Sequence, residues 1–430
     1  MGSIHQELFE GYSIGDFSPV RIMGIVNLSP ESFYQGSFIP NESLQTTIEK
    51  FIKYGATILD FGARSTAPWS DPISLDEELD RMQKTLTMIP ELVPKDIILS
   101  IDTQYSKVAR WSLEFGKKHG YRVMLNDISS FQTDPKMLDL VVSYNCPVCL
   151  MATFKKPGDA KTPQEILKAL HQSILELKKR NYDTQKVMVD PGIGKWVTEK
   201  TYEYDLAMLD HLHDFRAFQV PILVGLSRKS FIGSILEEKD ASKRDIGSLA
   251  ATSIAIYNGA HIIRTHDVDE KMQHTIKVAS AIRRKPIQIQ NNNQICEIEE
   301  QIWDKYATEI YLSELGVTLP GAKIMSRKMI SKNIILKNIT APQGLILKQE
   351  LLARGGDVAL HREVVTTENQ KYDEKFTAVL IGTLLQMEKL VKKLRGQDLE
   401  LDKLGKMIEA ALHKEEQIKE IYSTIYLLIK

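Results

Sequence analysis

The sequence of 430 residues has few cysteines, no excess of either charge and no long apolar run. Three cysteines, Cys146, Cys149 and Cys296, are too few for a disulfide scaffold, which favours a reducing, cytoplasmic setting. No apolar run is long enough to cross a bilayer. The N-terminus also lacks the basic and then apolar pattern of a signal peptide. We therefore expect a cytoplasmic protein with no membrane partner.

The charge balance argues against nucleic-acid binding. Lys and Arg together number 55 and Asp and Glu 56, which gives a formal net charge of -1. Proteins that bind nucleic acids usually carry a clear positive excess, so we expect no nucleic-acid partner. A local basic pocket for a phosphorylated small molecule is compatible with this total.

Up to about residue 284, short apolar runs alternate with longer amphipathic stretches. The runs are rich in Ile, Val and Leu, as strands buried on both faces are. They lie at 21–26, 57–61, 97–101, 121–125, 147–151, 186–190, 221–225 and 261–265. Eight strand–helix repeats in fewer than 300 residues predict a (β/α)8 TIM barrel. The alternative, a doubly wound open sheet, would need a glycine fingerprint after an early strand, and the sequence has none.

Beyond the barrel the composition changes. The Asn- and Gln-rich segment 285–295 is interpreted as a linker between a barrel over 1–284 and a second domain over 296–430. In that domain SKNIILKNI predicts a strand, whereas FTAVLIGTLLQMEKLVKKLRG is predicted to be helical. We expect a smaller α/β or α+β domain, and its sequence indicates no function.

Polar residues cluster directly after the predicted strands. In a barrel these positions converge on one mouth. They are Asn27, Asp60, Asp102, Asn126, Asp190, Arg228, Lys229, Arg264 and His266. One polar residue at a strand end can reflect turn preference alone. A polar residue at nearly every strand end predicts an active site.

The residue types indicate the kind of ligand. Carboxylates and an amide suit a heterocycle edged with N–H donors, such as an amino-pyrimidinone. A metal site is the main alternative, but the sequence has no HExxH or DxDxDG spacing. Arg264 and His266 are two residues apart and so share one strand face, which suits a diphosphate. Cys146 and Cys149 are three apart and point to opposite strand faces, which favours packing over metal binding.

The ordered motifs resemble those of the dihydropteroate synthase family, a group of pterin-binding (β/α)8 barrels. The resemblance covers roughly residues 20–284. The matching runs are IMGIVNLSPESF, DFGARSTAP, SIDT, LNDIS, DPGIG, GLSRKSFIG, GSLAATSIA and RTHDV. It implies a transferase that condenses a (7,8-dihydropterin-6-yl)methyl diphosphate with an arylamine and releases diphosphate. The pathway implied is folate or methanopterin biosynthesis.

The resemblance also implies a pterin site. Asp102, Asn126, Asp190 and Lys229 would hold the pterin ring, and Met151 would pack on its face.

The same resemblance implies a site for the leaving group. Asn27 would help coordinate Mg²⁺, the expected cofactor, and Arg264 and His266 would grip the diphosphate with help from Thr66. The residues expected to be catalytic are Asn27, Asp102, Lys229, Arg264 and His266.

For the arylamine, the resemblance implies contacts with Phe33, Pro68 and Ser230. The loop after the second predicted barrel strand, DFGARSTAPWSD (60–71), is called the second loop. It departs from the family pattern STRPG, because it reads STAPW and carries an earlier arginine, Arg64. This loop and the tract 151–162 look more like archaeal members, whose amine can be a ribofuranosyl-aminobenzene phosphate rather than p-aminobenzoate. We therefore expect Arg64, Lys155 or Lys156 to contact an anionic part of the amine.

Two other functions fit parts of the pattern. A corrinoid-linked methyltransferase on the same barrel would bind a pterin but would need no diphosphate site. A non-catalytic pterin-binding protein would explain the altered second loop. The diphosphate motifs favour the transferase. The family resemblance also implies a homodimer formed through outer helices late in the barrel.

Overall fold

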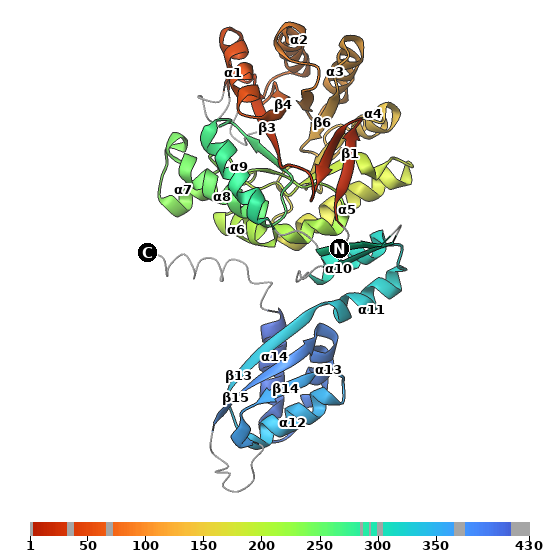
Figure 1. Ribbon diagram of the computed structural model, residues 1–430, viewed down its shortest axis with the longest axis vertical. Helices are drawn as coiled ribbons and strands as arrows, with labels where there is room; N and C mark the ends of the chain where they lie inside the picture. The colour runs from red at the N-terminus through yellow and green to blue at the C-terminus, as the bar shows by residue number, and fades with distance from the viewer. Residues whose placement is uncertain are drawn as a thin grey trace. The chain divides into compact units, whose positions relative to one another are not determined.

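The computed structural model describes residues 3–31, 38–65, 72–283, 287–291, 294–298, 304–364 and 375–413. The chain divides into two compact units between Glu300 and Gln301 (Figure 1). Each unit has its own sheet and its own hydrophobic core. Among the residues described, no helix is both long enough and apolar enough to cross a membrane.

The first unit is built on eight parallel strands. They are β3 (Arg21–Asn27), β4 (Ala56–Gly62), β5 (Ile98–Asp102), β6 (Val123–Asp127), β7 (Val148–Met151), β8 (Val187–Asp190), β9 (Leu223–Gly225) and β10 (Ile262–Thr265). They pair in the order β8-β7-β6-β5-β4-β3-β10-β9. A parallel bridge between Val189 and Ile222 closes the ring. The predicted TIM barrel is confirmed.

Helices follow the strands and surround the barrel (Figure 1). They are α1 (Asn41–Lys53), α2 (Leu75–Leu92), α3 (Ser106–His119), α4 (Lys136–Tyr144), α5 (Pro163–Lys179), α6 (Tyr202–Asp210), η3 (His211–Phe218), α7 (Ser230–Leu236), α8 (Asp245–Tyr257) and α9 (Glu270–Ile282). Local sequence explains their ends. Thr162 and Glu165 form a capping box at the start of α5, and Gly120 ends α3 with a left-handed φ of 71°.

The barrel interior changes from apolar to polar along the strands. One inward-facing layer is entirely apolar and consists of Met23, Ile58, Ile98, Met124, Cys149, Met188, Leu223 and Ile262. An antiparallel hairpin of β1 (His5–Phe9) and β2 (Tyr12–Gly15), which the sequence did not predict, packs Leu8 and Ile14 into this layer. Side chains two positions further along a strand point the same way. The next layer along the strands therefore carries the polar residues Asp60, Asn126 and Arg264 above this apolar layer.

A second hairpin follows the barrel. Strand β11 (Ile287–Asn291) pairs with β12 (Gln294–Ile298). It includes most of the segment 285–295 that was predicted to be a linker. The alternation of Ile with Gln in IQIQ suits a two-stranded ladder, whereas Asn and Gln content alone indicates a loop.

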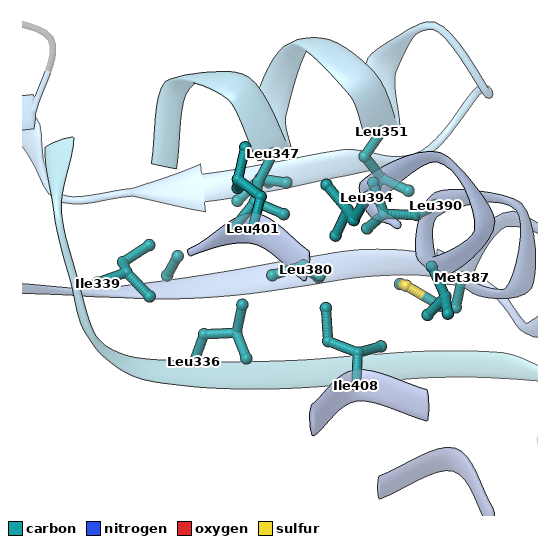
Figure 2. Packing of buried hydrophobic residues seen from close by; sticks show 13 residues of the cluster. Leu336, Ile339, Leu347, Leu351, Leu380, Met387, Leu390, Leu394, Leu401 and Ile408 are labelled. Atoms are coloured by element: carbon teal, nitrogen blue, oxygen red, sulfur yellow. The ribbon is translucent and has the colours of Figure 1, made fainter. Parts of the chain in front are cut away.

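The second unit is α+β, one of the two classes expected. Its elements are α10 (Lys305–Glu314), α11 (Leu319–Met329), β13 (Ser331–Ile339), α12 (Ala341–Leu352), β14 (Asp357–Leu360), β15 (Phe376–Thr383), α13 (Leu384–Leu394) and α14 (Leu401–His413). The strands form an antiparallel sheet in the order β13-β15-β14. Leu336 and Leu380 of the sheet pack against helix residues such as Leu347, Leu390 and Ile408 (Figure 2).

The helix predicted from Phe376 was wrong at its start. Residues 376–383 form β15, the central strand, which pairs on both sides. The helix α13 begins only at Leu384, where Thr383 accepts a hydrogen bond from the backbone N–H of Gln386. Because Ala378 and Leu380 are buried in the sheet, pairing with two neighbours outweighs the local helical pattern.

Candidate active site

Strand register gathers the polar residues at one end of the barrel. Asn27 lies opposite Gly62, Gly62 opposite Asp102, and Asp102 opposite Asn126. Further round the ring, Met151 lies opposite Asp190. Of the residues expected to hold a pterin ring, Asp102, Asn126 and Asp190 therefore come from strand ends, and Met151 ends the strand beside Asp190.

Arg264 lies between a buried carboxylate, Asp60, and a partly buried one, Asp102. Its Nε donates to Asp60 Oδ2 at 2.6 Å, and its Nη2 donates to Asp102 Oδ2 at 2.7 Å. Asn126 Nδ2 also donates to Asp60, at 3.3 Å. Asp60 is fully buried, so Arg264 supplies the countercharge that such a carboxylate requires.

Burial and the neighbouring charges shift the pKa values of both Asp102 and Arg264. Burial raises the pKa of Asp102 to about 7, an effect that Arg264 opposes and the negative charge of Asp60 reinforces. Burial alone would lower the pKa of Arg264, but Asp60 and Asp102 outweigh it and hold that pKa above its ordinary value. Arg264 is therefore always charged, whereas Asp102 changes its charge near neutral pH.

Asp190 and Lys229 also interact electrostatically at the mouth of the barrel. Burial raises the pKa of Asp190, while the backbone N–H of Gly192 donates to its Oδ1 at 2.7 Å and stabilises the carboxylate. Burial lowers the pKa of Lys229, and Asp190 opposes that shift. The Lys229 ammonium lies 5.3 Å from the centre of the Trp196 ring. The site thus holds a hydrogen-bond acceptor, Asp190, and a donor, Lys229, that interact electrostatically.

His266 follows Arg264 at the end of β10. Burial lowers the pKa of His266 to about 3, and the neighbouring charge of Arg264 adds to this effect. The imidazole is therefore neutral near pH 7 and can donate one hydrogen bond from its ring.

The model of the pterin binding enzyme family matches residues 23–266, more than half of the chain. The chain belongs to the pterin binding enzyme family. Its C-terminal unit lies beyond the matched residues.

Curated relatives and solved structures agree with this membership. The dihydropteroate synthase of Synechocystis sp. is 36% identical over 278 residues, covering 61% of this chain and 90% of that protein. The Escherichia coli K12 enzyme is 33% identical over 283 residues, covering 63% and 94%. The Coxiella burnetii dihydropteroate synthase in complex with pteroic acid has a TM-score of 0.56 at 34% identity, covering 65% of this chain and 99% of that chain. The Xanthomonas albilineans enzyme with 4-aminobenzoic acid has a TM-score of 0.55 at 30% identity, covering 66% and 100%.

The guanidinium of Arg228 donates hydrogen bonds to other groups of the protein. Its Nη2 donates to Asp267 Oδ1 at 2.6 Å, and its Nη1 donates to the carbonyls of Ala241 and Ser242. It therefore holds the loop before α7 against the end of β10. Lys229 and Ser230 follow directly, with Lys229 at the N-cap position of α7 and Ser230 as its first residue.

Arg64 joins the two ends of the second loop. Its Nε donates to Glu78 Oε2 at 2.6 Å, its Nη1 to the carbonyl of Ile73 at 2.7 Å and its Nη2 to that of Ser74 at 3.2 Å. Its guanidinium also lies 5.0 Å from the centre of the Tyr105 ring. These partners are protein groups, so the anion contact expected of Arg64 stays a prediction.

The loops that follow β3 and β4 are tied together beside Arg64. Arg81 on α2 donates from Nη1 to both carboxylate oxygens of Glu31, at 3.0 and 2.9 Å. The same nitrogen donates to the carbonyl of Ala63 at 3.2 Å. Phe33, Thr66 and Pro68, which were expected to contact substrate, lie outside the described residues.

Asn27, the residue expected to help coordinate Mg²⁺, ends strand β3. Its Oδ1 already accepts a hydrogen bond from Ser29 N at 3.0 Å. Among the described residues there is no group of three or more His, Cys, Asp or Glu that could hold a metal. Mg²⁺ is commonly bound through one or two protein oxygens together with substrate phosphates and water. An amide oxygen such as that of Asn27 belongs to this kind of ligand set.

Sequence reasoning missed several residues of the site. Asp60 was noted as a strand-end residue but received no role, although its position two residues after Ile58 places it on the inward face. Lys200, in the loop between β8 and α6, and Asp205, on α6, gave no signal, because charged residues in a loop or on a barrel's outer helix usually face solvent. The structure buries both.

Proposed function

We propose that this chain catalyses the dihydropteroate synthase reaction, joining a (7,8-dihydropterin-6-yl)methyl diphosphate to an arylamine with release of diphosphate. The observation that carries the proposal is the Asp60–Arg264–Asp102 arrangement, whose arginine also interacts electrostatically with Asp190 and Lys229. Family membership and the dihydropteroate synthase relatives support it. The product would enter folate or methanopterin biosynthesis.

The pterin ring would bind through its N–H edge. Asp102 and Asp190 offer carboxylate oxygens, and Asn126, whose Nδ2 donates to Asp60, keeps its amide oxygen as an acceptor. Lys229 would donate to a ring acceptor. Met151, fully buried at the end of β7, would pack against the ring face.

The chemical step breaks the C–O bond between the pterin methylene and the diphosphate. The electron pair leaves with the diphosphate oxygen and the methylene becomes cationic. The arylamine nitrogen then attacks the methylene and gives its proton to the released diphosphate. Asp102 as a carboxylate stabilises the developing cation. Arg264 and the neutral His266 stabilise the leaving anion, since Nη1 of Arg264 forms neither of the bonds to Asp60 and Asp102.

We also propose that Mg²⁺ binds together with the diphosphate, with Asn27 as its protein ligand. When bound, the ion would neutralise charge on the leaving group. The support is the amide oxygen of Asn27 at the end of β3 and the absence of a metal cage among the described residues. Titrating the enzyme with diphosphate in the presence and absence of Mg²⁺ tests this, and Asn27→Ala should weaken the magnesium-dependent part of binding.

The decisive experiment compares p-aminobenzoate with the ribofuranosyl-aminobenzene phosphate as second substrate. Diphosphate release that depends on either amine supports the transferase. Binding of pterin diphosphate without turnover for either amine supports a non-catalytic pterin-binding protein. Binding of a methylated pterin with no affinity for diphosphate supports the methyltransferase.

Arg64→Ala and Lys156→Ala should separate loop support from substrate contact. Arg64 joins both ends of the second loop, so its loss should lower kcat/KM for both amines. Lys156 is exposed, so Lys156→Ala should lower kcat/KM about tenfold only for the phosphate-bearing amine. Steady-state kinetics with both amines check this. Unchanged kcat/KM for both amines in both variants rules out these two residues.

Activity should fall as the pH drops below about 7. Burial raises the pKa of Asp102 to about 7, so acid protonates the carboxylate that stabilises the cation. The plot of kcat/KM against pH should rise to a plateau above neutrality. Asp102→Asn should lower the plateau and remove the acid limb. An unchanged limb in this variant assigns the titration to another group.

We propose further that the chain forms a homodimer through α8 and α9 and resides in the cytoplasm. Four large apolar side chains on these helices are exposed, Ile246, Ile254, Val278 and Ile282. Sedimentation equilibrium of the wild type and of Ile246→Glu tests the dimer.

The cytoplasmic location rests on Cys146, Cys149 and Cys296, which are free thiols.

A further inference from the structure

A buried ion pair lies beneath the loop that carries Asp190. Lys200 Nζ lies 3.0 Å from Asp205 Oδ1, and the two side chains are 0% and 3% exposed. Removing two charges from water costs free energy, and an apolar pair of similar volume is often equally stable. Stability alone therefore does not account for a lysine at this position.

The hydrogen bonds of the pair go to the loop backbone. Lys200 Nζ donates to the carbonyl of Gly192 at 2.7 Å, and Asp205 Oδ1 accepts the backbone N–H of Gly194 at 2.9 Å. The Gly192 carbonyl also accepts from Trp196 Nε1 at 3.0 Å. The pair thus fixes two backbone positions within four residues of Asp190.

Gly192 and Gly194 lie close to the residues that are proposed to bind the pterin. The backbone N–H of Gly192 donates to Asp190 Oδ1. A Cβ at Gly192 would lie 3.1 Å from Met151 Cγ, and one at Gly194 would lie 3.0 Å from Lys229 Nζ. Both glycines have positive φ, 71° and 129°, so the loop follows a path that few other residues allow. A small shift of this loop would move three pterin contacts together.

We propose that Lys200 and Asp205 are positioning residues that hold the Asp190 loop in the shape that binds the pterin ring. The inference rests on the proposed pterin-dependent function. It assigns the pair an effect on pterin affinity rather than on folding. Lys200 touches the Gly192 carbonyl and acts on the substrate through Asp190, Met151 and Lys229.

The test is the double variant Lys200→Met/Asp205→Asn. Methionine fills the volume of the lysine stem, and the amide oxygen of asparagine can still accept the Gly194 N–H, so no buried charge is left alone. The matched control is Lys84→Met/Asp80→Asn. It makes the same substitutions at a pair 2.6 Å apart on the exposed face of α2, with 67% and 55% exposure.

Binding of the pterin diphosphate by isothermal titration, steady-state kinetics and the melting temperature are measured for wild type, variant and control. We expect the variant to keep its melting temperature while the pterin dissociation constant and the pterin KM rise about tenfold, since slight misplacement costs that much or more. The arylamine KM and the control should match wild type. A lower melting temperature with unchanged pterin KM assigns the pair a structural role, and unchanged binding with unchanged stability also overturns the proposal. Failure of the wild type itself to bind the pterin would instead overturn the proposed function.

Discussion

Arg264→Gln should lower kcat/KM by at least about a hundredfold, because the substitution removes a preorganised donor to the leaving group. It also removes the countercharge of Asp60 and Asp102, which Arg264 contacts at 2.6 and 2.7 Å. Arg264 opposes the burial that raises the pKa of Asp102. The acid limb of the pH profile should therefore move above pH 7 in the residual activity of this variant.

Two further variants separate chemistry from folding. Arg264→Lys keeps the positive charge but cannot reach both carboxylates with a planar fork, so we expect a folded enzyme with an intermediate loss of kcat. Arg180→Gln is the matched control, since Arg180 pairs with Asp139 on the exposed surface and should leave kcat/KM unchanged. Full activity in Arg264→Lys would contradict a role for the two-pronged contact. A loss as large in Arg180→Gln would show a general effect of arginine removal.

The mouth of the barrel was predictable because its signals are local. Each parallel strand appears as a short apolar run, and the residue at its end points in a direction fixed by the period of two. Arg264 and His266 on one strand illustrate this, as do Asn126 and Asp190 at the ends of others. The convergence of these ends follows from closure of the ring, which eight repeats imply.

The partners of these residues could not be predicted. Asp60 and Arg264 are 204 positions apart, and only tertiary structure pairs them. Lys200 lies in a charged stretch that resembles a solvated loop. The strand β15 precedes a real helix, and its pairing with two neighbours is a property of the sheet rather than of its own residues. The protein partners of Arg64, such as the carbonyl of Ile73, could not be predicted either, because they depend on where the second loop returns to α2.

Asp16→Asn should lower the free energy of unfolding of the barrel unit by about 3 to 5 kcal/mol, the usual effect of removing one partner of a buried ion pair. Asp16 accepts two hydrogen bonds from Arg216, at 2.6 and 2.8 Å, and one from Arg283 at 3.2 Å. It also accepts the backbone N–H of Ile4 at 2.7 Å. The substitution would leave two buried guanidinium groups without their carboxylate and would loosen the N-terminal hairpin. Asp139→Asn, at an exposed ion pair, should change the stability by less than about 1 kcal/mol.

The pH dependence of the stability difference between wild type and Asp16→Asn tests whether Asp16 is the stabilising carboxylate. Burial would raise the pKa of Asp16, but the hydrogen bonds from Arg216 and His261 outweigh it and hold the pKa well below 3.8. Its contribution is therefore complete above the unfolded value of 3.8 and is lost as the pH falls below it. Burial also lowers the pKa of His261 from 6.5 to about 3. Between these two pH values the unfolded state takes up a proton that the folded state does not, which lowers the free energy of unfolding. Urea titrations followed by tryptophan fluorescence should give a stability difference between wild type and Asp16→Asn that stays constant from pH 8 to about 5 and shrinks in stronger acid. A difference that vanishes already at pH 6 would assign the stabilisation to a group other than Asp16.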